Sequence, residues 1–278
     1  MFAALPLVYA CIAPHGDEMV QELVGDKPGF AVETANGMTK LAAEMEKSRP
    51  DTIVIATPHN LRLLGRIGGV TAENSSGRVG VGDKSIALEA KCDTEIAMEL
   101  VSAAEEARIP VAGANYGTAS GPLSNMAMDW GTLIPLWFFL RLTRLRSRID
   151  IVTPSREIPL KQNYIFGVKV AQVAERSGKR VAFVASSDQA HTHDKSGPYG
   201  YSKNAAVYDR KVVEAIEGGR LSDIMKFSPS MVDEARPDSL WQMVMLAGVL
   251  EEVRMTGRLY SYEVATYFGM LCAGYTRN

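Results

Sequence analysis

Short apolar runs rich in valine and isoleucine recur along the chain. They cover residues 7–13, 52–56, 108–112, 149–152 and 180–185. These runs lack the alternation of polar and apolar residues that marks a strand with one exposed face. They therefore predict strands that are buried on both faces, as in a parallel sheet.

Between these runs, apolar residues recur at helical spacing. Met38, Leu41 and Met45 fall on one helical face, and Asp93 and Thr94 open a second helical segment. We expect further helices over 160–174, 205–216 and 238–249, and one or two late strands within 259–275. The alternation predicts an α/β fold with a mostly parallel central sheet and helices on both of its faces.

Three stretches rich in glycine and polar residues punctuate this pattern. They cover residues 71–84, 113–121 and 194–203. In an open α/β sheet, loops gather beyond the strand ends and often build the binding site. We expect these stretches to be such loops.

Composition and charge exclude several classes of partner. The chain has 278 residues, of which 46% are hydrophobic and 22% charged, and its formal net charge is -2. This balance gives no reason to expect a nucleic acid or an anionic membrane as partner. No apolar run reaches the length of about 18 residues that a membrane span needs, and the apolar N-terminus lacks the basic start of a signal peptide.

The three cysteines are too few and too far apart for a disulfide framework or a cysteine-based zinc site. They are Cys11, Cys92 and Cys272. An odd number without close spacing fits a reducing compartment. We therefore expect a cytoplasmic protein.

Three of the four histidines stand where an apolar run ends. These are His15, His59 and His191. Since ligand sites of open α/β sheets lie at the carboxyl ends of the strands, the three imidazoles are expected to share one crevice. A lone histidine is more often a hydrogen-bonded surface residue, and His193 fits that interpretation.

Clustered imidazoles suit two kinds of chemistry. They bind Fe(II), Zn and Cu, and they act as acids or bases near neutral pH. Two histidines and one carboxylate on one face of a metal are typical of non-haem Fe(II) oxygenases.

Four segments carry a resemblance to a known family. They read PHGD and TPHN around the first two histidines, MDWGTLIPLWFF over 128–139, and SSDQAHTH over 186–193. The last is followed by GPYGY and by a helix that opens with AAVYDRKVVEAI. In order and spacing the chain resembles the class III extradiol ring-cleaving dioxygenases, typified by the beta subunit of protocatechuate 4,5-dioxygenase. Memo-like proteins are relatives of this family.

The resemblance implies roles for several residues. His15 and His59 would be metal ligands, with Fe(II) as cofactor and another divalent metal such as Zn as a substitute in a purified sample. His191 would be the acid–base residue. Residues 1–278 would form a single catalytic domain. The substrate would be lined by Asp188, His193, Trp130 and Tyr199, although Asp188 also suits a structural role in its turn.

Two positions depart from the family pattern. The family's third ligand is usually a glutamate near the start of the helix that here reads PDSLWQMVMLAGVL; Asp238 stands in register, and Glu234 lies one turn earlier. Asp after Pro is also what a helix start uses, so a ligand role and a capping role both stay open for Asp238. Trp130 replaces a histidine found in many members. An indole transfers no proton at neutral pH, so Trp130 is expected to form either an aromatic wall or part of the core.

The resemblance implies a reaction and two alternatives. The reaction is cleavage of a catechol-type ring with O2, in a homo-oligomer that sometimes needs a small partner subunit. The first alternative is a zinc hydrolase that uses the same ligands and a metal-bound water. The second is a non-catalytic, Memo-like binding protein on the same fold.

Overall fold

The computed structural model describes residues 6–25 and 31–277 and contains one large sheet. Its eight strands follow the spatial order β10-β11-β1-β9-β2-β8-β3-β6. In that order their bounds are Thr256–Glu263, Met270–Thr276, Leu7–Ala13, Val181–Ser186, Thr52–Ala56, Arg148–Thr153, Ile67–Val70 and Val111–Ala114.

The centre of this sheet is parallel. The neighbours β1, β9, β2 and β8 are all parallel to one another. Strands β3 and β6 are parallel to each other. Antiparallel pairs join β11 to β1, β10 to β11 and β3 to β8. The prediction of a mostly parallel α/β sheet is confirmed, and each antiparallel pair includes at least one strand outside the four central ones.

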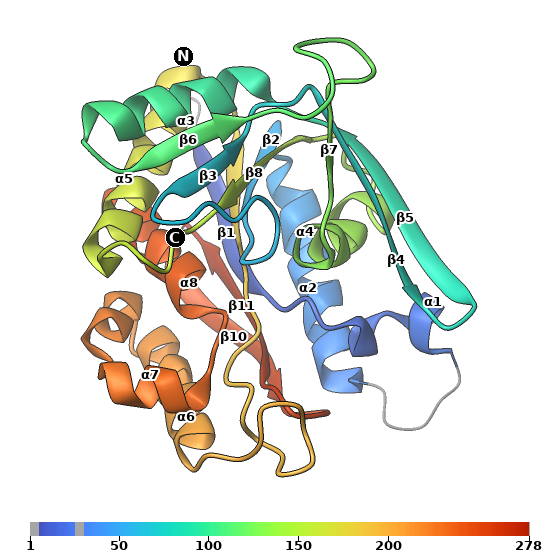
Figure 1. The fold of residues 1–278 in the computed structure, drawn as a ribbon, viewed down its shortest axis with the longest axis vertical. Coiled ribbons are helices and arrows are strands. Elements are labelled where there is room, and N and C mark those ends of the chain that lie inside the picture. The colour runs from blue at the N-terminus through green and yellow to red at the C-terminus, as the bar shows by residue number, and fades with distance from the viewer. Residues whose placement is uncertain (1–5, 26–30, 278) are drawn as a thin grey trace.

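Helices cover both faces of the sheet, as predicted (Figure 1). One face carries α2 (Val32–Ser48) and α4 (Trp130–Leu136). The other face carries α3 (Thr94–Glu106), α5 (Leu160–Ser177), α6 (Asn204–Glu217) and α8 (Leu240–Glu252). Shorter helical segments are η1 (Asp17–Met19), α1 (Gln21–Val24), the π-helical turn η2 (Trp137–Arg141), η3 (Leu221–Lys226) and α7 (Pro229–Ala235).

Strand β2 shows why the central runs are apolar throughout. Ile53 and Ile55 pack into the buried cluster beneath α2 and α4, whereas Val54 and Ala56 pack into the cluster beneath α5 and α8. Because both faces are covered, no position of the strand meets water, and the polar alternation disappears.

The expectation of a loop over 71–84 is wrong. Strand β4 (Asn74–Val81) turns at Gly82 into β5 (Lys84–Lys91), and β7 (Asn125–Ala127) completes a second, three-stranded sheet. Gly77, within β4, has a packing reason. A Cβ on Gly77 would lie 2.6 Å from the carbonyl oxygen of Met128, just before α4. The close approach of another segment requires a glycine inside the strand. The composition of β4 therefore resembles that of a loop.

Two further properties of the described residues bear on the expectations from composition. In these ranges no helix is both long and apolar enough to cross a membrane. Cys11, Cys92 and Cys272 are all buried and free.

Candidate metal centre

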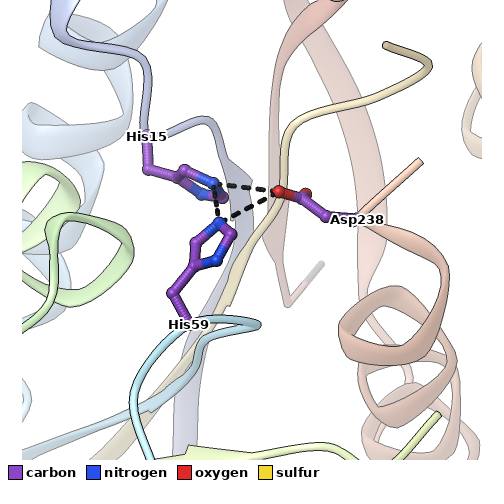
Figure 2. Close-up of side chains that lie close together, drawn as sticks. All are labelled: His15, His59 and Asp238. Carbon is purple, nitrogen blue, oxygen red and sulfur yellow. Dashed lines mark hydrogen bonds and ion pairs between the residues drawn. The ribbon is translucent and has the colours of Figure 1, made fainter. Parts of the chain in front are cut away.

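Parallel strands deliver two histidines to one edge of the sheet. Strand β1 ends at Ala13 and β2 at Ala56, and His15 and His59 follow in the loops beyond them. Figure 2 shows both rings turned toward the carboxylate of Asp238, which arrives from the segment just before α8. The Nε2 atoms of the two histidines are 3.2 Å apart, and each lies 3.2 Å from Oδ2 of Asp238.

This triangle of donor atoms has the dimensions of a metal site. Metal–donor bonds of about 2.1 Å place neighbouring donors of one ion about 3.0 to 3.4 Å apart. The observed separations of 3.2 Å lie inside this range. Two imidazoles and one carboxylate on one face leave the opposite face of an ion free for other molecules. The residues therefore fit a divalent metal.

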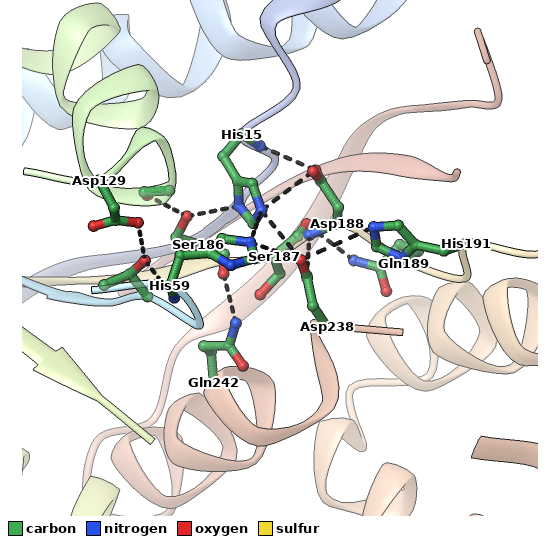
Figure 3. Close-up of polar contacts among 12 residues, drawn as sticks. His15, His59, Asp129, Ser186, Ser187, Asp188, Gln189, His191, Asp238 and Gln242 are labelled. Carbon is green, nitrogen blue, oxygen red and sulfur yellow. Dashed lines mark hydrogen bonds and ion pairs between the residues drawn. The ribbon is translucent and has the colours of Figure 1, made fainter. Parts of the chain in front are cut away.

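Ser186, the last residue of β9, sets the tautomer of His15. The Ser186 hydroxyl donates its proton to the carbonyl oxygen of Gly131. It can therefore only accept at Nδ1 of His15, 3.0 Å away, so Nδ1 carries the ring proton. In the neutral ring the lone pair then stands on Nε2, which faces the triangle (Figure 3).

Asp238 is held by the loop after β9 and not by the helix that follows it. The expected helix over 238–249 begins two residues later, at Leu240. Oδ1 of Asp238 accepts a hydrogen bond of 3.0 Å from the backbone amide of Asp188, which leaves Oδ2 for the histidines. Glu234 lies apart from this cluster and bonds with Ser202 and Asn204.

His15 and Asp238 are buried, whereas His59 is partly exposed, and charged groups dominate the environment of the triangle. Burial alone would lower the pKa of His15, but the neighbouring carboxylates of Asp188 and Asp238 raise it to about 9. Burial alone would raise the pKa of Asp238. The neighbouring His15 and the hydrogen bonds from His15 and His59 instead hold this pKa well below its usual range. Burial raises the pKa of Asp188. A divalent cation would compensate these carboxylates in place of the ring proton, which metal binding would release.

A second set of contacts positions His59. Asp129, just before α4, accepts hydrogen bonds from Thr57 Oγ1 at 2.9 Å and from Asn60 Nδ2 at 3.0 Å, on either side of His59. A Cβ on Gly131 would lie 2.6 Å from Thr57 Oγ1 and 3.2 Å from the ring of His59. The segment MDWGT thus clamps the His59 loop. The sequence predicts no role for Asp129 or Gly131, and their only signal is the motif itself.

Trp130 lies against the triangle of His15, His59 and Asp238, called the metal triangle below, and not in the core. Its ring stacks on that of His59, with centroids 4.2 Å apart, and it is 49% exposed. It does not line the main cavity described below. The indole therefore covers one side of His59 from the solvent.

His191 lies beside the triangle without joining it. Its Nε2 is 4.0 Å from Oδ2 of Asp238. Its ring stacks on Phe268, and Tyr199 meets it edge to face. Nδ1 of His191 is buried and has no hydrogen-bond partner among the described residues. His191, Asp188 and Asp238 also form a second group close enough to bind a cation.

The side chains of Asp188 and His193 contact other residues and do not line the cavity described below. Asp188 accepts a hydrogen bond from the backbone amide of His15, and its Oδ2 lies 3.3 Å from the ring of His15. His193 bonds through Nε2 to Asp209 at 2.7 Å, and the Tyr262 hydroxyl donates to the same carboxylate oxygen. The structure therefore places His193 in a separate network, outside the cavity lining.

A cavity of about 790 Å³ opens over the metal triangle. His59, His191 and Asp238 lie in its wall, together with Tyr199. Much of the remaining wall is apolar: Ile158, Leu160, Phe227, Val232, Leu240 and Trp241. Its size and character suit a small organic molecule.

Comparison with known proteins adds three findings. Residues 9–271 match the family described as the catalytic LigB subunit of aromatic ring-opening dioxygenase. Protein CA_C1420 of Clostridium acetobutylicum is 23% identical over 254 residues, which are 91% of this chain and 54% of that protein, so the chain spans about half the length of this relative. The uncharacterized protein JW3007 from Escherichia coli K12 shares the fold, with a TM-score of 0.64, 17% identity, and coverage of 96% of this chain and 99% of the other.

Proposed function

Because the chain belongs to the family of the catalytic LigB subunit of aromatic ring-opening dioxygenases, we propose that it cleaves a catechol-type ring next to its diol with O2. The observation that carries the proposal is the triangle of His15, His59 and Asp238 with His191 beside it. Of these, His59, Asp238 and His191 line one cavity. Fe(II) is the proposed cofactor, because two imidazoles and one carboxylate are the donor set of non-haem iron oxygenases.

The residues around the cavity divide the work. His15, His59 and Asp238 would hold the metal, which would supply open coordination positions for the diol and O2. The apolar wall accepts the ring and keeps water away from it. Ser186 keeps the ring of His15 in place through its hydrogen bond with Nδ1. Asp188 accepts a hydrogen bond from the backbone amide of His15 and lies 3.3 Å from its ring.

His191 moves the proton. In this proposal its Nε2 takes a proton from a substrate hydroxyl and returns it to the opened product. Its position supports the role, since it lies in the cavity wall 4.0 Å from the carboxylate of Asp238. An imidazole can accept a proton and the resulting imidazolium can give it back, which are the two steps required.

Iron content and oxygen uptake test the proposal. The protein is loaded with Fe(II) without air, its iron is quantified, and O2 uptake is followed with a panel of catechols. Iron close to equimolar with the chain and catechol-dependent uptake are expected. His15→Ala and His59→Ala should lose both, whereas His191→Phe should keep the iron and lose the uptake. His193→Gln, on the same loop but outside the cavity, is the control and should keep both.

The same experiment separates the alternatives. The donor triangle also suits zinc, which would make a bound water the nucleophile of a hydrolase. Bound metal without uptake for any catechol would favour that reaction. Absence of stable metal binding would contradict both and favour a non-catalytic, Memo-like binding protein. One catalytic domain over 1–278, homo-oligomerisation, a small partner subunit and a cytoplasmic location stay predictions from the sequence.

A further inference from the structure

A buried carboxylate lies behind the loop that carries His191. Asp209 on α6 is fully buried and stands outside the cavity lining. Its Oδ1 accepts a hydrogen bond of 2.9 Å from the backbone amide of Ala190, the residue before His191. Its Oδ2 accepts one from the Tyr262 hydroxyl and faces Nε2 of His193, each 2.7 Å away. Burial, with the nearby carboxylate, raises the pKa of Tyr262, so its hydroxyl keeps the proton that it donates.

The same carboxylate lies where the start of β11 meets this loop. Gly269, just before β11, accepts a hydrogen bond of 2.7 Å from the amide of Gln189 and donates one of 3.0 Å to the carbonyl oxygen of Ala190. A Cβ on Gly269 would collide with Oδ2 of Asp209, so a glycine leaves room for the carboxylate. Asp209 and Gly269 therefore bond both backbone groups of Ala190 and hold the chain directly ahead of His191.

Among the described residues, no hydrogen bond orients the ring of His191. Its Nδ1 is one of the buried atoms without a partner in this part of the chain, and its Nε2 lies 4.0 Å from Oδ2 of Asp238, beyond hydrogen-bond distance (Figure 3). The ring stacks on Phe268, and the His191 amide donates to the carbonyl oxygen of Ala235. The direction of this imidazole therefore depends on the backbone that carries it.

We propose that Asp209 is a positioning residue for His191. Through the Ala190 amide it fixes the backbone of the loop, and the backbone fixes the direction in which the imidazole meets the substrate. The inference rests on the proposed function for the proton transfer that His191 performs. A displacement of about 1 Å at a reacting group can cost about 100-fold in rate. A carboxylate that never touches the substrate can therefore govern turnover.

Histidine ring signals in NMR spectra test the contact without any turnover. The chain has four histidines, so His191→Phe identifies the ring signal of His191 among only a few. Spectra are recorded with excess Zn(II), which is diamagnetic. In Asp209→Ala the His191 signal should shift or broaden, because the loop loses its acceptor, while the signals of His15 and His59 stay in place. Asp209→Asn keeps a carbonyl oxygen for the Ala190 amide and should restore the His191 signal.

Kinetics with the Fe(II)-loaded protein test the consequence. Asp209→Ala should lower kcat of catechol-dependent O2 uptake by about 10- to 100-fold and leave KM and iron content close to wild type. Asp209→Asn should recover most of kcat. If Asp209→Ala does not fold, Asp209→Ser replaces it with the same expected results, because its hydroxyl ends one bond short of the position of Oδ1.

Asp93→Ala is the matched control. Asp93 is likewise buried and accepts hydrogen bonds, from Thr52 Oγ1 and the Ile96 amide, but Thr52 begins β2 and so marks the opposite edge of the sheet. This variant also loses a buried carboxylate, yet it should keep kcat and the His191 signal.

The outcomes separate this inference from the proposed reaction. An unchanged His191 signal in Asp209→Ala, equal changes in all histidine signals, or the same effect in Asp93→Ala would overturn the positioning role. A selective change at His191, with no O2 uptake by the wild type for any catechol, would overturn ring cleavage and keep the positioning role. Uptake that Asp209→Ala leaves unchanged would do the reverse.

Discussion

A single hydroxyl decides how His15 presents its ring. Ser186 donates to the carbonyl oxygen of Gly131 and accepts from Nδ1 of His15, so the lone pair of Nε2 faces His59 and Asp238. Partners that orient a ligand in this way contribute to metal affinity although they never touch the metal. Ser187, the next residue, is also buried, but its hydroxyl has no hydrogen-bond partner in the described chain.

These neighbouring serines make a matched pair of variants. Ser186→Ala should weaken metal binding by roughly 10- to 100-fold, because His15 loses the acceptor that selects its tautomer. Ser187→Ala should leave the affinity unchanged. Competition with a chromophoric zinc chelator measures both. Equal affinities of the two variants would show that Ser186 does not act through His15.

At the scale of elements, two glycines bring α5 and α8 into close contact. A Cβ on Gly167 would lie 1.9 Å from the carbonyl oxygen of Met245, and a Cβ on Gly248 would lie 2.0 Å from that of Tyr164. Both clashes meet backbone, which cannot turn aside. The contact fixes α8, and α8 begins two residues after Asp238.

Adding one methyl group at this contact should therefore affect stability and the site together. Gly248→Ala is expected to lower the free energy of unfolding by roughly 1–3 kcal/mol, as overpacking does, and to weaken metal binding by displacing Asp238. Urea unfolding and metal titration check this. Glu175→Ala, on the exposed side of α5, is the control and should change stability by less than about 0.5 kcal/mol. If Gly248→Ala matches the wild type in both unfolding free energy and metal affinity, the two helices can move apart without cost and the prediction is wrong.

At the scale of the whole molecule, one buried acid is expected to tie stability to pH. Asp150 on β8 is 1% exposed, and neither carboxyl oxygen has a hydrogen-bond partner among the described residues. Burial, with a smaller effect of Asp93, raises the pKa of Asp150 to about 8. The unfolded chain releases this proton near pH 4. Between these values the folded protein binds more protons, so its stability falls as pH rises.

Replacing Asp150 should remove this dependence. The advantage in unfolding free energy of Asp150→Val over wild type should grow between about pH 4 and pH 8, by at most about 1.4 kcal/mol per pH unit, and stay constant above. Asp150→Asn, which is polar but does not titrate, should show the same flattening with lower stability than valine. Urea unfolding across the pH range measures all three proteins. A difference that does not change with pH would contradict the assigned pKa.

Prediction from the sequence worked where local pattern carries the information. The apolar runs 7–13 and 52–56 coincide with β1 and β2, because a strand buried on both faces needs apolar residues at every position. The strand-end rule then indicated His15 and His59 as neighbours, and the structure brings them together. The sequence does not predict β4, because the segment that packs against Gly77 is Met128, about 50 residues later in the chain.

The sequence by itself determined the α/β alternation, the covered sheet and the edge at which its histidines gather, because each follows from residues close together in the chain. Only the tertiary structure decided that Asp238 faces His15 across 223 positions and that Ser186 orients His15. The direction of a side chain and the choice of its partner depend on packing between distant segments, and no local periodicity encodes that packing.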